Sequence, residues 1–219
     1  LGTERMARRR VIIRKLSAVQ ALGSATVICS DKTGTLTKNE MTVRVAVTAG
    51  GRTGFTGTGY GPEGELRREG GPLADKAERA DVERLLRAAV LASNATLRRG
   101  EERWEVLGDP TEGALVVAAR KAGVVAEDLA ARFRRVGEIP FSSERKLMST
   151  VHRHTEQQDR AVVFTKGAPD VLLARCTSEA VDDGRRPLTD DRRAEILRVN
   201  ETLAGEALRR ALEEPARAE

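Results

Sequence analysis

The stretch from Arg134 to Thr165 contains three successive strand candidates, and it decides the fold class that the sequence predicts. They read RRVGEI (134–139), LMSTVH (147–152) and AVVFT (161–165). Strands that follow one another in a run, with helices before and after them, are typical of an α+β domain with an antiparallel sheet. We therefore predict an α+β fold with an antiparallel sheet and flanking helices.

Helical patterns flank these strands on both sides. The expected helices cover residues 75–98, 110–122, 127–133, 170–175 and 190–212. Asp75 or Asp81 could cap the first, and Asp109 caps the second with Pro110 at its first position. A half-exposed strand is expected over 41–49, followed by a glycine-rich hairpin-and-loop region.

The first forty residues follow a different pattern. Ala25 to Cys29 is short, apolar and β-branched, which is typical of a buried strand of a parallel sheet, and a polar loop follows it. The partners that such a sheet requires are missing from the sequence. We therefore expect two domains, residues 1–44 and residues 45–219.

Composition excludes several classes of protein. With 219 residues and 40% hydrophobic side chains, the chain is long and apolar enough to form a core and is not disordered. The longest useful uncharged stretch, Leu16 to Ser30, is shorter than the roughly 20 apolar residues that a membrane-spanning helix needs. Cys29 and Cys176 lie far apart, which favours a reducing compartment and no disulfide framework.

The net charge of +5 invites comparison with nucleic-acid-binding proteins. Acidic residues are interspersed almost everywhere, however, and an aromatic content of 3% leaves little to stack on bases, so we expect no nucleic-acid partner. The basic start, Arg5 to Lys15, suits the cytoplasmic end of a membrane segment. Because the chain begins at Leu1 rather than Met, we expect it to be part of a longer protein.

The most informative loop is DKTGTLT, residues 31–37, which follows the expected buried strand. A carboxylate at the C-terminal end of a parallel strand, here Asp31, lies where α/β sheets bind ligands. Gly34 permits a sharp turn towards an anion, Lys32 adds positive charge, and the threonine hydroxyls add donors. This set suits a carboxylate that accepts a phosphoryl group beside Mg²⁺. By local chemistry alone, a solvated turn with a helix-capping Asp31 fits equally well.

Taken with its flanks, this loop resembles the phosphorylation signature of P-type cation-transporting ATPases, specifically the bacterial calcium-pump-like class. The resemblance is carried by CSDKTGTLT (29–37) together with RKL (14–16), AV (18–19), LGSATVIC (22–29) and KNEMTV (38–43). It implies one strand and loop of a haloacid-dehalogenase-like α/β phosphorylation domain. It also implies that Asp31 becomes an aspartyl phosphate, that the Asp31 carboxylate and the Thr33 carbonyl hold Mg²⁺, and that Thr35 helps to hold the phosphate.

Later segments resemble the nucleotide-binding domain of the same family. In GDPTEGAL (108–115), the family implies that Asp109 and Glu112 lie near adenine, with Glu112 accepting a hydrogen bond from the exocyclic amine. Asp109 can also cap its helix while leaving Glu112 available. The segment PFSSERKLMS (140–149) implies that Phe141 stacks on adenine, although the same residue could belong to the core.

Within the same segment, the resemblance implies that Lys146 approaches the phosphates and that Met148 lines the adenine face. The KGAPD segment (166–170) resembles the Lys-Gly-Ala signature at the pocket floor, formed by Lys166, Gly167 and Ala168. Gly167 would let the ligand approach the backbone closely. The family's phosphate-contacting arginine corresponds to Arg209 or to Arg217.

The expected function is the cytoplasmic ATP-binding and phosphoacceptor part of an ATP-driven cation transporter, with Ca²⁺ as the cation. ATP and Mg²⁺ are the expected cofactors. The partners are the transmembrane, actuator and remaining phosphorylation-domain parts of the same pump. By itself, the chain is expected to be a soluble monomer that is inactive because its catalytic site is incomplete.

Two alternatives remain open at this stage. The chain could act as an ATP-binding module without chemistry, or as a phosphatase of the haloacid dehalogenase superfamily. Such phosphatases carry a general-acid aspartate two residues after the nucleophile, where this sequence has Thr33. His152 and His154 are expected on one strand face as surface residues rather than as a zinc site.

Overall fold

The chain divides into two compact units, Leu1–Asn39 and Glu40–Glu219. The computed structural model describes residues 5–6, 8–9, 24–27, 29, 40–156, 160–181 and 184–213. The buried strand expected from Ala25 to Cys29 is wrong for its described residues, which form no strand and leave Val27 76% exposed. A parallel strand needs hydrogen-bonded neighbours, and no strand in the described part of the chain pairs with this segment.

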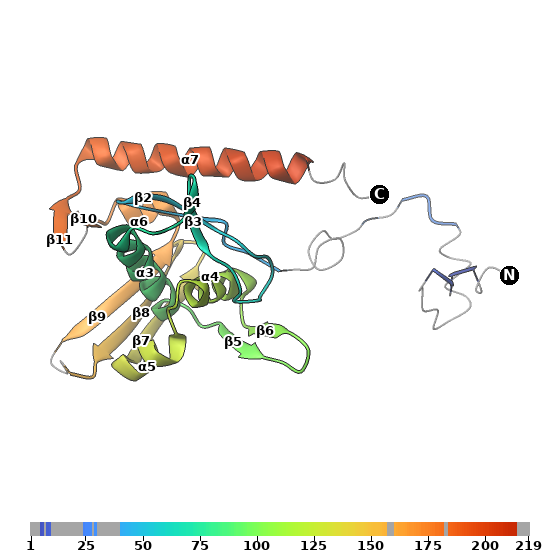
Figure 1. Cartoon of the computed structure of the whole chain (residues 1–219), viewed down its shortest axis with the longest axis horizontal. Helices are drawn as coiled ribbons and strands as arrows, with labels where there is room; N and C mark the ends of the chain where they lie inside the picture. The colour runs from blue at the N-terminus through green and yellow to red at the C-terminus, as the bar shows by residue number, and fades with distance from the viewer. Residues whose placement is uncertain are drawn as a thin grey trace. The chain divides into compact units, whose positions relative to one another are not determined.

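The second unit is a mixture of helices and antiparallel strands (Figure 1). Its elements in chain order are β1 (Val45–Thr48), β2 (Gly51–Phe55), β3 (Leu66–Arg68), β4 (Gly71–Pro72), α3 (Lys76–Leu91), β5 (Thr96–Arg99), β6 (Trp104–Leu107), α4 (Pro110–Lys121), α5 (Ala126–Arg132), β7 (Phe133–Ser142), β8 (Leu147–His154), β9 (Ala161–Gly167), α6 (Pro169–Leu173), β10 (Ser178–Val181), β11 (Gly184–Pro187) and α7 (Asp190–Glu213). The α+β class with antiparallel strands is therefore confirmed for this unit. Among the described helices, none has the length and apolarity to cross a membrane.

Helix α3 is the element around which the unit packs. It contacts α4, α5, β1 and β9, and in the view of Figure 1 it lies with α4 between the long helix α7 and the strands β7–β9. Its buried face carries Val82, Leu86 and Val90, spaced four residues apart as a helical stripe requires. The facing helix α4 contributes Ala118 and Ala119, whose small side chains let the two helices approach closely.

The predicted helix starts are confirmed, but the first helix ends earlier than expected. The Asp75 carboxylate accepts a hydrogen bond of 2.9 Å from the Glu78 amide and caps α3. Helix α3 stops at Leu91, although we expected it to continue to residue 98. Residues 96–99 instead form strand β5, since pairing with β6 satisfies their backbone groups.

Strands β7, β8 and β9 form a three-stranded antiparallel sheet in the order β7-β8-β9. In its register, Thr150 of β8 lies between Glu138 of β7 and Phe164 of β9. The pairing of β7 with β8 shifts between Ile139 and Ser142, just before the turn that joins the two strands. The three strands predicted from this stretch are therefore confirmed, with ends extended by one to three residues in β7, β8 and β9.

The expectation that both histidines lie at the surface is wrong for His152, whose side chain is only 2% exposed. Its Nε2 lies 3.1 Å from the Leu91 carbonyl oxygen and 3.0 Å from Thr150 Oγ1, and its Nδ1 lies 3.2 Å from the Phe133 carbonyl oxygen. The end of α3 covers this face of β8, which strand alternation alone did not reveal. Within the described residues, no group of histidine, cysteine and acidic side chains could hold a metal ion.

The close contacts around Gly167, at the end of β9, predict that a side chain at this position destabilises the fold. Gly167 has a φ of +157°, and a Cβ there would meet the Lys146 carbonyl oxygen and lie 2.9 Å from Leu147 Cα. We expect Gly167→Ala to lower the free energy of unfolding by about 1–3 kcal/mol, measured by denaturant titration. Gly71→Ala is the matched control because a Cβ at this position meets nothing within 4 Å and its φ is not positive. An equal loss of unfolding free energy in both variants would contradict a specific steric requirement for glycine at position 167.

Candidate functional site

The predicted phosphorylation loop lies outside the described residues. This applies to Asp31, Lys32, Thr33, Gly34 and Thr35, and so also to Asp31 and Thr33 as expected Mg²⁺ ligands. Their fit to Mg²⁺ therefore rests on donor chemistry: a carboxylate and a backbone carbonyl are oxygen ligands of the kind that Mg²⁺ prefers.

Glu112 lies in the first turn of α4 with both carboxylate oxygens engaged. Its Oε2 accepts hydrogen bonds from the backbone amides of Asn94 (2.6 Å) and Ala95 (3.0 Å). Its Oε1 receives the Lys166 ammonium at 2.5 Å, and 12% of the Glu112 side chain is exposed. Three of about four acceptor positions of this carboxylate are thus occupied, which leaves one for a further donor.

Asp109 positions this turn. Its Oδ1 accepts hydrogen bonds from the Thr111 amide (2.8 Å) and the Glu112 amide (3.1 Å), so it caps α4 as predicted. The positive end of the helix dipole also favours a carboxylate at Glu112. The cap therefore uses the backbone amide of Glu112 and not its carboxylate, as expected from the sequence.

Lys166 lies near the end of β9, and its ammonium pairs with Glu112 in the first turn of α4. Its ammonium also donates to Ser93 Oγ at 3.3 Å, and a quarter of its side chain is exposed. Met148 is its register partner on β8, so the two side chains leave the sheet on the same face. The Met148 side chain is buried, with only 3% of it exposed.

Phe141 and Lys146 flank the turn between β7 and β8. Phe141 is 61% exposed, so it does not belong to the core, which was the alternative that the sequence left open. Lys146 is exposed, has a φ of +54°, and donates its amide to the Ser142 carbonyl oxygen at 2.8 Å. The Lys146 carbonyl oxygen accepts the Ala168 amide at 3.0 Å, which joins this turn to the Lys-Gly-Ala segment.

The structure therefore brings together most of the predicted nucleotide-binding residues at one end of the β7–β9 sheet. At this end, Gly167 allows the backbone of β8 to lie close to β9, because a Cβ on residue 167 would collide with it. Arg209 belongs to α7, a different element, and Arg217 lies outside the described residues.

Sequence reasoning missed a group of residues behind this site. Arg135 Nη1 donates to Asn94 Oδ1 and to Glu138 Oε2 (3.2 Å), and Asn94 Nδ2 donates to Glu138 Oε1 (2.9 Å). Ser93 and Asn94 interrupt the apolar helical pattern after Leu91, and this break could have indicated a turn. Arg135 and Glu138 carried no such signal, because charged residues are common on exposed strand positions.

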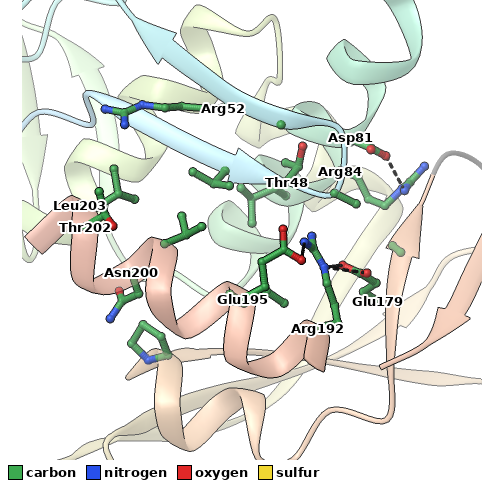
Figure 2. Close-up of a pocket in the computed structure, with 18 of the residues that line it drawn as sticks. Thr48, Arg52, Asp81, Arg84, Glu179, Arg192, Glu195, Asn200, Thr202 and Leu203 are labelled. Atoms are coloured by element: carbon green, nitrogen blue, oxygen red, sulfur yellow. Dashed lines mark hydrogen bonds and ion pairs between the residues drawn. The ribbon is translucent and has the colours of Figure 1, made fainter. Parts of the chain in front are cut away.

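A groove also lies elsewhere, beneath α7 (Figure 2). It has a volume of about 880 Å³ and is lined by both apolar and polar residues, mainly from α3, α7 and the β1–β2 hairpin. Its polar residues include Arg84, paired with Asp81 at 3.0 Å, and Arg192, paired with Glu195 at 2.7 Å. None of the predicted nucleotide-binding residues lines it, so its size does not bear on the candidate site.

Comparison of the sequence with known proteins identifies the family. A family profile described as "P-type ATPase, cytoplasmic domain N" matches residues 81–211. "Probable cation-transporting ATPase F" of Mycobacterium tuberculosis is 46% identical over 211 residues, which cover 95% of this chain and 22% of the relative. "Calcium-transporting ATPase" of Bacillus subtilis is 40% identical over 211 residues, covering 95% of this chain and 23% of the relative.

A mammalian relative extends the comparison. "Calcium-transporting ATPase type 2C member 1" of Bos taurus is 42% identical over 180 residues, covering 81% of this chain and 18% of the relative. The chain thus spans about a fifth of the length of the curated relatives that it matches. With more than half of its residues matched by the family profile, the chain belongs to the P-type cation-transporting ATPases and carries their cytoplasmic domain N.

Proposed function

We propose that this chain is the ATP-binding and phosphoacceptor part of an ATP-driven cation transporter, with residues 45–219 as the nucleotide-binding domain. The observation that carries the proposal is that the Glu112–Lys166 ion pair lies at the same end of the sheet as Phe141 and Lys146, which flank the β7–β8 turn. Such a site offers an exposed aromatic ring, two ammonium groups and one remaining carboxylate acceptor. These groups match the base and the phosphates of ATP.

Each residue has a distinct proposed role in binding. Phe141 stacks on adenine, because its ring is exposed and stacking contributes about 1–3 kcal/mol per base. Glu112 accepts the exocyclic amine at its remaining acceptor position. Lys146 and Lys166 bind phosphate oxygens, and Asp109 holds the first turn of α4. Arg209 is proposed to contact the phosphates.

The phosphoryl-transfer step is assigned to residues 1–44 in the intact protein. Asp31 attacks the γ-phosphorus of ATP, the bond to the β,γ-bridging oxygen breaks, and ADP leaves with the electron pair. Lys32 and Thr35 stabilise the transferred phosphoryl group, and Gly34 lets the backbone turn towards it. Asp31 and Thr33 would hold Mg²⁺, which would neutralise charge on the phosphate oxygens when bound.

Ca²⁺ is the proposed cargo because several relatives are named as calcium-transporting ATPases. No residue of this chain is proposed to bind the transported ion. The proposed partners are the transmembrane and actuator parts and the rest of the phosphorylation domain, all on one polypeptide with this chain at the cytoplasmic face. By itself, the chain is expected to bind ATP as a monomer without turnover.

The first prediction from the proposed function concerns the stacking residue. ATP should bind the chain with a Kd of roughly 0.1–1 mM, and Phe141→Ala should weaken binding about 5- to 100-fold because the stacking surface is lost. Amide shifts followed during an ATP titration measure both constants. Val163→Ala removes a similarly exposed apolar side chain (58% exposed) and should leave affinity unchanged. Absence of shifts around Phe141 and Lys166 would refute the pocket.

The second prediction concerns the ion pair. Glu112→Gln places an amide group against the Lys166 ammonium or the two backbone amides, so we expect a loss of about 1–3 kcal/mol in unfolding free energy together with weaker ATP binding. Thermal unfolding and ATP titration measure the two effects. Glu127→Gln, which alters an exposed pair with Arg120 at 3.5 Å, should change neither.

The third prediction concerns the phosphoacceptor. The full-length protein incubated with γ-labelled ATP and Mg²⁺ should acquire a hydroxylamine-sensitive label, because an aspartyl phosphate is an acyl phosphate. Asp31→Asn should abolish the label, and Asp75→Asn should retain it. A label that survives Asp31→Asn, or rapid phosphatase turnover by the present chain, would contradict the assignment.

A further inference from the structure

We propose that Arg135 is a positioning residue for the candidate nucleotide site, acting on Lys166 through the turn of residues 93–95 and Glu112. This inference rests on the proposed ATP-binding role of Lys166. It assigns a part in that role to a side chain on β7 that is not among the groups proposed to touch the nucleotide. The contacts form a continuous series from Arg135 to the Lys166 ammonium.

The first step joins Arg135 to the end of α3. Its Nη2 donates to the carbonyl oxygens of Leu91 (2.9 Å) and Ser93 (2.7 Å). The last carbonyls of a helix lack intrahelical partners and carry partial negative charge, so a guanidinium there is favourable. Arg135 thereby fixes where the chain leaves α3.

The second step holds the side chain of Asn94. Its Oδ1 accepts from Arg135 Nη1, and its Nδ2 donates to Glu138 Oε1 at 2.9 Å. Glu138 Oε2 in turn accepts from Arg135 Nη1 at 3.2 Å, which closes a ring of three side chains. Both ends of the Asn94 amide are therefore held, and the planar guanidinium supplies donors that a lysine could not arrange in this way.

The third step links Asn94 to the Glu112–Lys166 pair. With Asn94 held, its backbone amide and that of Ala95 converge on Glu112 Oε2 at 2.6 and 3.0 Å. The other oxygen of the same carboxylate binds Lys166 at 2.5 Å. A shift of residues 93–95 would therefore move the Glu112 carboxylate, and the Lys166 ammonium would move with it.

Loss of the Arg135 side chain should change the contacts that lead to Lys166 more than it changes the packing of the core. The Leu91 carbonyl oxygen retains Thr150 Oγ1 at 3.0 Å and His152 Nε2 at 3.1 Å. Moreover, the side chains of Arg135 and Glu138 are 31% and 28% exposed, so their removal leaves no deep cavity. We therefore expect an Arg135 variant to fold with a displaced Lys166.

The test uses the whole chain, with Arg135→Gln compared to Arg134→Gln. Arg134 is the adjacent, exposed arginine on β7, and its side chain leaves the opposite face of the strand. The 15N signal of the Lys166 ammonium, recorded without nucleotide, should shift and exchange faster with water in Arg135→Gln and remain as in the parent chain in Arg134→Gln. ATP affinity should fall about 3- to 10-fold in Arg135→Gln only.

A double-mutant cycle separates positioning from a general structural effect. In a Lys166→Gln background, Arg135→Gln should have no further effect on ATP affinity, because the group that it positions is gone. An unchanged Lys166 signal in Arg135→Gln, or an equal loss of affinity in both backgrounds, would overturn the proposal. Glu138→Gln opens the same ring while keeping Arg135, and gives a second readout if Arg135→Gln does not fold.

The two hypotheses fail in different ways. If the parent chain binds no ATP, the proposed function falls, while the Lys166 signal without nucleotide still decides whether Arg135 positions it. If the parent chain binds ATP and Arg135→Gln leaves both the signal and the affinity unchanged, only the positioning role falls.

Discussion

The carbonyl groups at the end of α3 connect the helices of the second unit to its three-stranded sheet. Leu91 and Ser93 expose carbonyl oxygens that the helix itself cannot satisfy, and donors from β7 and β8 reach them. Leaving such a buried group unpaired costs about 1–3 kcal/mol. The sheet therefore docks where its polar side chains meet this helix end, and His152 is buried as one consequence.

The candidate site follows from the same junction. Immediately after these carbonyls, the chain turns and presents two backbone amides to Glu112, at the start of α4. Glu138 pairs with Arg135 and Glu112 pairs with Lys166, so each carboxylate has a cationic neighbour. These groups are already paired with one another before any ligand arrives, and such pre-organisation reduces the ordering cost of binding.

Local sequence rules predicted the elements whose cause is local. Asp75 and Asp109 were expected to cap helices and do so, because a cap needs only a side chain and the next few amides. The strands of the sheet were likewise evident from their composition. The early end of α3, the hairpin β5–β6 and the burial of His152 were missed, since each depends on a partner distant in sequence.

The sequence by itself determined the class of the fold, the family signatures and the identity of most candidate nucleotide-binding residues, because residue type and spacing carry that information. Only the tertiary structure decided that Glu112 and Lys166 pair, that Phe141 is exposed, that Met148 is buried, and that Arg135 stands behind them. These facts depend on which strand lies beside which helix end. No local pattern encodes such a relation, since it arises from long-range packing and from the need to satisfy buried polar groups.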